Sequence, residues 1–145
     1  MLAGTLMLGA CTSTPPVTKE VSIVPITNHL EETNGAFVLK SNTSIGVIDA
    51  ELIPAAEYLA DMLSGATGYD LKVKEGEGTI TLALGDVQGK EGAYTLTAES
   101  DKVNITGNSY GGVIAGIESL RQLFPPQIES KEIVKGTDWA IPAVN

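Results

Sequence analysis

The sequence is short of the residues that build most ligand sites, with one cysteine, one histidine and one tryptophan in 145 residues. A lone cysteine has no disulfide partner within the chain, and one cysteine with one histidine cannot assemble a Cys/His zinc site. Basic residues are also few: nine Lys and Arg stand against 18 Asp and Glu, a net charge of −9. That balance disfavours nucleic acid, whose phosphates need a basic surface. We therefore expect no metal, no cofactor and no nucleic-acid partner.

Long apolar runs are missing as well. Residues 1–10 are apolar or small and carry no charge, but a membrane-spanning helix needs about 20 apolar residues. The stretch fits the apolar part of a secretory signal, and the run Leu8-Gly9-Ala10-Cys11 resembles a bacterial lipobox, in which the chain is cut before the cysteine and that cysteine is acylated. The basic start of such signals is absent, because the first Lys or Arg is Lys19.

From this segment we expect residues 1–10 to be an incomplete lipoprotein signal and Cys11 to be the lipidation site. Residues 11–20 are rich in Thr and Pro and are expected to form a flexible tether. The expected location is the bacterial cell envelope, as a membrane-anchored lipoprotein facing the periplasm or the surface. The alternative is that Cys11 is a buried apolar thiol, as many free cysteines are.

The remaining chain, residues 21–145, has the 43% hydrophobic content of one globular domain. Leu52, Leu59 and Leu63 fall at helical spacing, with Pro54 in the first turn and Gly65 or Gly68 as the stop. A second helix is expected over 113–124, ended by Pro-Pro. Strands or extended segments are expected at 21–25, 37–40, 44–49, 71–74, 79–84, 93–99, 103–106 and 139–144, with a hairpin tip at 100–101. This order predicts an α+β two-layer sandwich, with a mostly antiparallel sheet and two helices packed on one face.

Carboxylates are plentiful but show no catalytic arrangement. Glu31 and Glu32 are adjacent in an expected loop, and Glu57 and Asp61 are four apart on the polar face of the first helix. Catalytic carboxyls need burial or a close charge partner to shift their pKa, and the sequence indicates neither. His29 is expected to be exposed in the polar loop 29–35. The sequence thus predicts no catalytic residue of its own.

Three other features have both a structural and a functional interpretation. The run Ser109-Tyr110-Gly111-Gly112 lacks the spacing of a phosphate loop, so a tight strand-to-helix turn explains its glycines. Arg121 is the cation inside the second helix and is expected to be a surface residue, with contact to a neighbouring domain as the alternative. Trp139 could stack on a sugar, but the apolar residues after it favour packing in a last strand.

Several motifs, in order, resemble the N-terminal accessory domain of family 20 β-N-acetylhexosaminidases. They are IVP at 23–25, AAEYL at 55–59, ATGYDL at 66–71, EGAYTL at 91–96, GGVIAGIESLRQL at 111–123 and WAIPAV at 139–144. Each motif is weak alone, but together they span nearly all of residues 21–145 in the family's order. One departure is Ile26, where a short Pro-containing run is common.

The resemblance implies a parent glycoside hydrolase that removes terminal N-acetylhexosamine from glycans, with the substrate's acetamido oxygen as nucleophile. The work is done by an Asp-Glu pair in a (β/α)₈ barrel that follows this domain. The sequence contains no Asp-Glu dipeptide, so the barrel is absent from this chain and no catalytic residue can be carried over. The implied partners are that barrel, which this domain would brace, a glycan through the parent enzyme, and a membrane through the lipid anchor.

Two alternatives remain open at this point. The same small domain precedes the barrel of family 84 hexosaminidases, and only residues of the barrel would distinguish the two families. The chain could also be a free-standing, lipid-anchored module that binds a glycan or a partner without catalysis.

Overall fold

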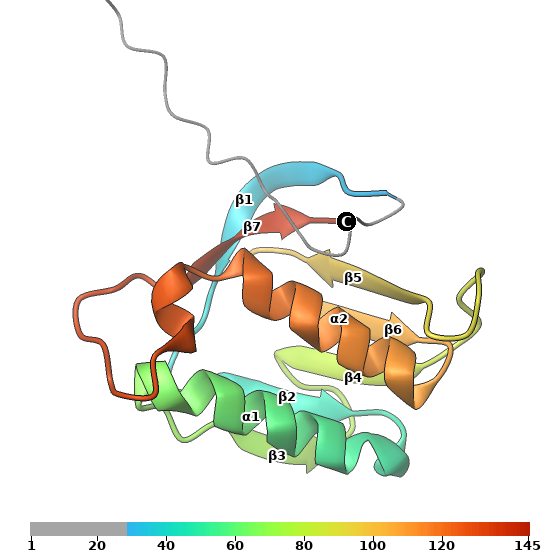
Figure 1. Cartoon of the computed structure of the whole chain (residues 1–145), viewed down its shortest axis with the longest axis horizontal. Helices are drawn as coiled ribbons and strands as arrows, with labels where there is room; N and C mark the ends of the chain where they lie inside the picture. Colours follow the sequence, from blue (N-terminus) through green and yellow to red (C-terminus); the bar gives the residue numbers. More distant parts are fainter. Residues whose placement is uncertain (1–28) are drawn as a thin grey trace, which may run out of the picture.

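The computed structural model describes residues 29–145, which form a sheet with two helices on one face (Figure 1). The expected signal segment, the lipidation site Cys11, the tether and the extended segment at 21–25 lie outside the described residues.

The sheet has seven strands in the order β1-β7-β5-β6-β4-β2-β3. The strands are β1 (Glu32–Val38), β2 (Ser44–Val47), β3 (Lys72–Glu75), β4 (Ile80–Leu84), β5 (Tyr94–Ala98), β6 (Val103–Gly107) and β7 (Ala140–Val144). The helices are α1 (Ile53–Thr67) and α2 (Tyr110–Leu123), with short 3-10 turns η1 (Ala50–Leu52) and η2 (Pro126–Glu129). The expected α+β sandwich with both helices on one face is confirmed.

The sheet combines an antiparallel half with a parallel half. Strands β1, β7, β5 and β6 pair antiparallel, and the predicted hairpin is present, with Ala98 opposite Val103 at its closed end. Strands β6, β4, β2 and β3 pair parallel to one another, a feature that the expectation of a mostly antiparallel sheet did not include. Strand β3 lies parallel to β2 because α1 carries the chain back along the sheet between them.

The register shows which side chains face the helices. Tyr94 bonds to Ser119 of α2, and a Cβ on Gly116 of α2 would lie 2.4 Å from Ile105. Leu96 is the partner of Ile105 across the hairpin and therefore shares this face. The core between the layers also includes Ile45, Val47, Ile80, Leu82 and Val103 from the strands and Leu59, Leu63, Ile117 and Leu120 from the helices. The opposite face of the sheet is polar, with Thr81, Thr95, Thr97, Asn104 and Thr106 at the alternate positions.

Helix α1 begins and ends as its sequence predicts, whereas α2 begins at Tyr110, three residues before the expected start. Pro54 lies in the first turn of α1, and Gly68 caps its end in the left-handed conformation with φ 71°; Gly65, the other expected stop, lies inside the helix. The hydroxyl of Ser109 accepts a hydrogen bond of 3.1 Å from Gly112 at the start of α2. Helix α2 ends at Leu123, just before the Pro-Pro pair.

The connection from β3 to β4 crosses β2 on the polar face of the sheet. Both strands run parallel to β2 on opposite sides of it, so residues 76–79 must pass over β2 to join them. They pass so close to Gly46 that a Cβ there would lie 2.2 Å from the carbonyl oxygen of Gly76. The turn is held by a hydrogen bond of 2.8 Å from the amide of Gly76 to the carbonyl of Val47. Gly46 is therefore required by the crossing.

One expectation about the described residues was wrong. The polar segment 29–35 was expected to be a loop holding Glu31 and Glu32, but β1 begins at Glu32. The strand is irregular between Glu32 and Ala36, and Gly35 has φ 111°. Pairing with β7 therefore outweighed the polar composition of the segment, because backbone hydrogen bonds do not depend on apolar side chains.

Candidate interdomain surface

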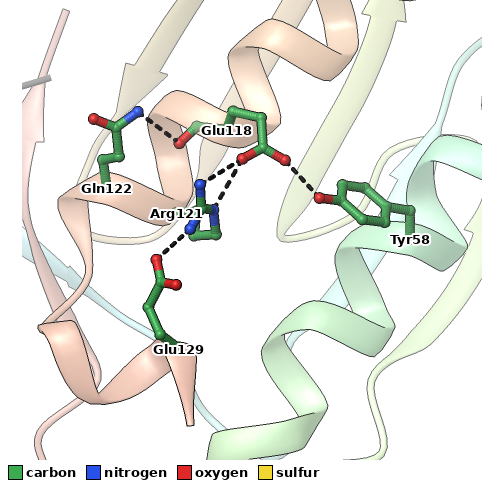
Figure 2. Close-up of polar contacts among 5 residues, drawn as sticks. All are labelled: Tyr58, Glu118, Arg121, Gln122 and Glu129. Atoms are coloured by element: carbon green, nitrogen blue, oxygen red, sulfur yellow. Dashed lines mark hydrogen bonds and ion pairs between the residues drawn. The ribbon is translucent and has the colours of Figure 1, made fainter. Parts of the chain in front are cut away.

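The outer side of the helix layer carries a polar network that joins three separate parts of the chain (Figure 2). Tyr58 of α1 donates a hydrogen bond of 2.5 Å from its hydroxyl to Oε1 of Glu118 on α2. Tyr58 and Glu118 are 60 residues apart in sequence, so this bond links the two helices across their outer surface.

Arg121 binds two carboxylates from different elements. Its Nε and Nη2 donate to Oε2 of Glu118 at 2.9 and 2.7 Å. Its Nη1 contacts Oε1 of Glu129, the last residue of η2. The planar guanidinium can serve both carboxylates at once, which a lysine could not do. The network thus ties η2 to α2, and through Glu118 to α1.

The contacts with Glu118 raise the pKa of both Tyr58 and Arg121. The hydrogen bond to Glu118, followed by burial, raises the pKa of the Tyr58 phenol above its ordinary value of 10.0, because the bonded carboxylate would be repelled by a phenolate. The hydrogen bond to Glu118 also raises the pKa of Arg121. The Arg121 side chain is 28% exposed, so each of these ion pairs contributes at most about 1 kcal/mol to stability.

A shallow hollow of about 430 Å³ lies beside the network. Its walls come from α1, α2, η2 and the two residues after η2, and they mix charged residues with the apolar surface of Met62 and Ile128. Tyr58 and Tyr110, on the same helix layer, are exposed aromatic residues at 45% and 42%. Within residues 29–145, the other exposed large apolar residues are Val38, Ile48 and Ile133.

The other residues weighed from the sequence are either exposed or packed in the core. His29 is exposed and lies 3.9 Å from Glu31, and Glu57 and Asp61 are exposed on α1 as expected. Trp139 is 4% exposed and packs in the core just before β7, which confirms the packing interpretation. The two glycines after Ser109 were expected in a strand-to-helix turn but lie in the first turn of α2, where a Cβ on Gly112 would lie 2.5 Å from the carbonyl oxygen of Ala93.

Within residues 29–145, no group of three or more His, Cys, Asp or Glu side chains could hold a metal ion. No helix in that range is long and apolar enough to cross a membrane. Sequence reasoning singled out Arg121 but missed Tyr58, Glu118 and Glu129 as its neighbours, because their meeting depends on how α1, α2 and η2 pack. The i, i+3 spacing of Glu118 and Arg121 was the one available signal.

Comparison with known proteins identifies the domain. The model for glycosyl hydrolase family 20, domain 2, matches residues 20–145. A β-hexosaminidase of Porphyromonas gingivalis is 31% identical over 125 residues, which covers 83% of this chain and 16% of that protein. A β-N-acetylhexosaminidase of Cellulomonas fimi is 31% identical over 110 residues, 71% of this chain and 22% of that protein.

Solved structures give the same result. The family 20 β-N-acetylhexosaminidase of Streptomyces coelicolor superposes with a TM-score of 0.74 at 31% identity, over 80% of this chain and 24% of that one. The N-acetyl-β-hexosaminidase of Streptomyces plicatus superposes with a TM-score of 0.70 at 32% identity, over 80% and 23% of the two chains. The chain spans only about a sixth to a quarter of these relatives, and none of the reported matches favours family 84. The chain belongs to glycosyl hydrolase family 20, as its domain 2.

Proposed function

We propose that this chain is the accessory domain of a β-N-acetylhexosaminidase that hydrolyses terminal N-acetylhexosamine residues of glycans. The observation that carries the proposal is the match to domain 2 of the family across residues 20–145, in a chain that spans a fraction of its relatives. The chain has no Asp-Glu pair, so it is inactive alone and catalysis belongs to a separate barrel domain.

Within that enzyme the domain braces the barrel through its helix layer. The outer side of α1 and α2 carries exposed Tyr58 and Tyr110, half-buried Ile114 and the Arg121 network. Partly desolvated arginine and tyrosine side chains are the residues that interfaces favour. The opposite face of the sheet is lined by threonines and crossed by the turn over Gly46, which makes it the less suitable surface.

The activity is tested by reading the gene beyond Asn145 and expressing the whole frame. We expect a continuous frame with an Asp-Glu pair, and a product that releases p-nitrophenol from p-nitrophenyl N-acetyl-β-D-glucosaminide. The 145-residue chain alone should release none. A stop codon directly after Asn145 would contradict the proposal and favour the free-standing module.

We further propose that the protein is a lipoprotein of the bacterial cell envelope, anchored through acylated Cys11. The Leu-Gly-Ala-Cys run and the Thr- and Pro-rich segment after it support this. Expression from the native start of the gene with radiolabelled palmitate should label the wild-type protein and leave Cys11→Ser unlabelled. Equal labelling of both proteins, or of neither, would contradict a lipid anchor at Cys11.

A further inference from the structure

Strand β5 is paired along its length on one side only, although it lies inside the sheet between β6 and β7. Strand β5 pairs with β6 along its whole length, from Tyr94 opposite Gly107 to Ala98 opposite Val103. On its other side β5 pairs with β7 at a single position, Ala98 opposite Val144. Figure 1 shows the C-terminal end of β7 beside β5. Among residues 29–145, the part of β5 before Ala98 has no strand neighbour on this side.

The unpaired backbone groups of β5 can be assigned from its bonds to β6. The carbonyl of Ala93 accepts from Asn108, and the amide of Glu99 donates to Lys102, so odd-numbered residues direct their backbone groups toward β6. The amides and carbonyls of Tyr94 and Leu96 therefore point away from β6, into the open side. Such a row of unpaired groups is a template for another strand.

A groove lies along this open edge. It has a volume of about 1100 Å³ and is lined by β5, by the loop 86–93, by Leu30 and by the chain end at Val144 and Asn145. Its loop wall is held in place by Asn108, whose side chain donates 2.9 Å to the carbonyl of Lys90 and accepts 2.9 Å from the amide of Gly92. Asn108 thus fixes the loop that forms one wall of the groove.

Strand β7 is already aligned to continue into this groove. Asn145 is held in strand geometry by two backbone hydrogen bonds with Glu31, at 2.9 and 3.1 Å. Counting on from the pair Ala98–Val144 in the antiparallel direction, the first residue after Asn145 comes opposite Leu96, and the third comes opposite Tyr94. The first and third residues would lie on the helix side, and the second would lie beside Thr95 on the polar side.

We propose that this groove is the docking site for the polypeptide that follows Asn145 in the full-length enzyme, bound as an extended strand antiparallel to β5. The pairing adds a strand to an open edge, a recurrent mode of peptide recognition. It fixes the path of the chain from this domain into the next one. The inference rests on the proposed function, in which the chain continues beyond Asn145.

The test uses this chain lengthened by four residues. One version adds Val-Thr-Val-Thr after Asn145, which places the valines opposite Leu96 and Tyr94. The matched control adds Thr-Val-Thr-Val, which has the same composition with the alternation shifted by one residue. Amide hydrogen exchange of Tyr94 and Leu96 is then measured by NMR in both versions and in the chain that ends at Asn145.

We expect the first extension to slow exchange of both amides at least tenfold, and the shifted control to slow it much less. No slowing by either extension would overturn the proposal, and equal slowing by both would overturn the assigned register. Concentration-dependent slowing in the unextended chain would also overturn it, since the edge would then take a second copy. The readout needs no catalysis, so its failure is distinct from a missing hexosaminidase activity.

Discussion

The crossing over β2 makes Gly46→Ala the sharpest test of the fold. The added Cβ would lie 2.2 Å from the oxygen of Gly76, 2.4 Å from the nitrogen of Gly78 and 2.7 Å from the carbonyl carbon of Glu77. All three are backbone atoms, so no side-chain rotation relieves the contacts. The turn is also fixed on both sides of the crossing, because Gly76 bonds to Val47 and the amide of Gly78 bonds to the hydroxyl of Thr81 at 3.2 Å.

The loss of stability expected for Gly46→Ala is the balance of two effects. Overpacking costs about 1–3 kcal/mol, and backbone obstacles place this position at the upper end. Alanine recovers about 0.5–1 kcal/mol because it is less flexible than glycine in the unfolded chain. The net expectation is a loss of about 2 kcal/mol, which lowers Tm by about 8 °C in a domain of this size.

The assay is thermal and urea unfolding, followed by circular dichroism and by the fluorescence of buried Trp139. Gly111→Ala is the matched control, because a Cβ there meets only the Ser109 hydroxyl, at 3.8 Å, inside helix α2. It should leave stability unchanged or raise it by up to about 1 kcal/mol. A Gly46→Ala protein within about 0.5 kcal/mol of wild type, where neutral surface changes fall, would refute the crossing geometry.

Three further predictions concern the polar contacts. Glu118→Gln should lower the pKa of Tyr58 toward 10.0, as measured by NMR titration of the assigned ring, and an unchanged pKa would contradict the hydrogen bond to Glu118. Because the pKa of Tyr58 is raised in the folded state, this hydrogen bond stabilises the fold fully below about pH 10, and its contribution is lost as the pH rises through the folded pKa. Arg121→Lys should lower the free energy of unfolding, measured with urea, nearly as much as Arg121→Ala, by about 1 kcal/mol or less, since lysine cannot bind Glu118 and Glu129 together. A lysine variant as stable as wild type would count against the network. Asn108→Ala should cost about 1–2 kcal/mol of stability and speed amide exchange in the loop before β5. Asn108→Asp should not restore slow exchange, because it keeps the acceptor for Gly92 but loses the donor to Lys90; slow exchange in either variant would show that Asn108 does not hold the loop.

Local signals in the sequence predicted most of the elements. The apolar spacing of Leu59 and Leu63, the stop at Gly68 and the Pro-Pro end of the second helix act within a few residues, so both helices could be placed. The β5–β6 hairpin was predicted for the same reason, because its turn at residues 100–101 is local.

Contacts between distant residues were not predictable in the same way. The parallel pairing of β2 with β4 requires residues 76–79 to cross β2 at Gly46. This close backbone contact joins residues that are distant in the sequence. Asp49 illustrates the difference: it precedes the first helical turn, but its carboxylate accepts a hydrogen bond of 2.8 Å from the amide of Leu84 instead of capping that turn. Likewise, the partners of Arg121 come from α2 and η2, and Tyr58 of α1 joins them through Glu118. No single-sequence pattern places these elements side by side.

The central claim, that the helix layer braces a further domain, is tested most directly by cysteine accessibility. Ala115→Cys lies on the outer side of α2, and Lys74→Cys lies on the opposite face of the sheet, beside Gly46. Each variant carries Cys11→Ser, so that the introduced cysteine is the thiol read out, and is labelled with a maleimide in the isolated chain and in the full-length enzyme. The account predicts that the full-length protein protects the cysteine at 115 and leaves the one at 74 as reactive as in the isolated chain. Protection at 74 with free labelling at 115 would contradict it.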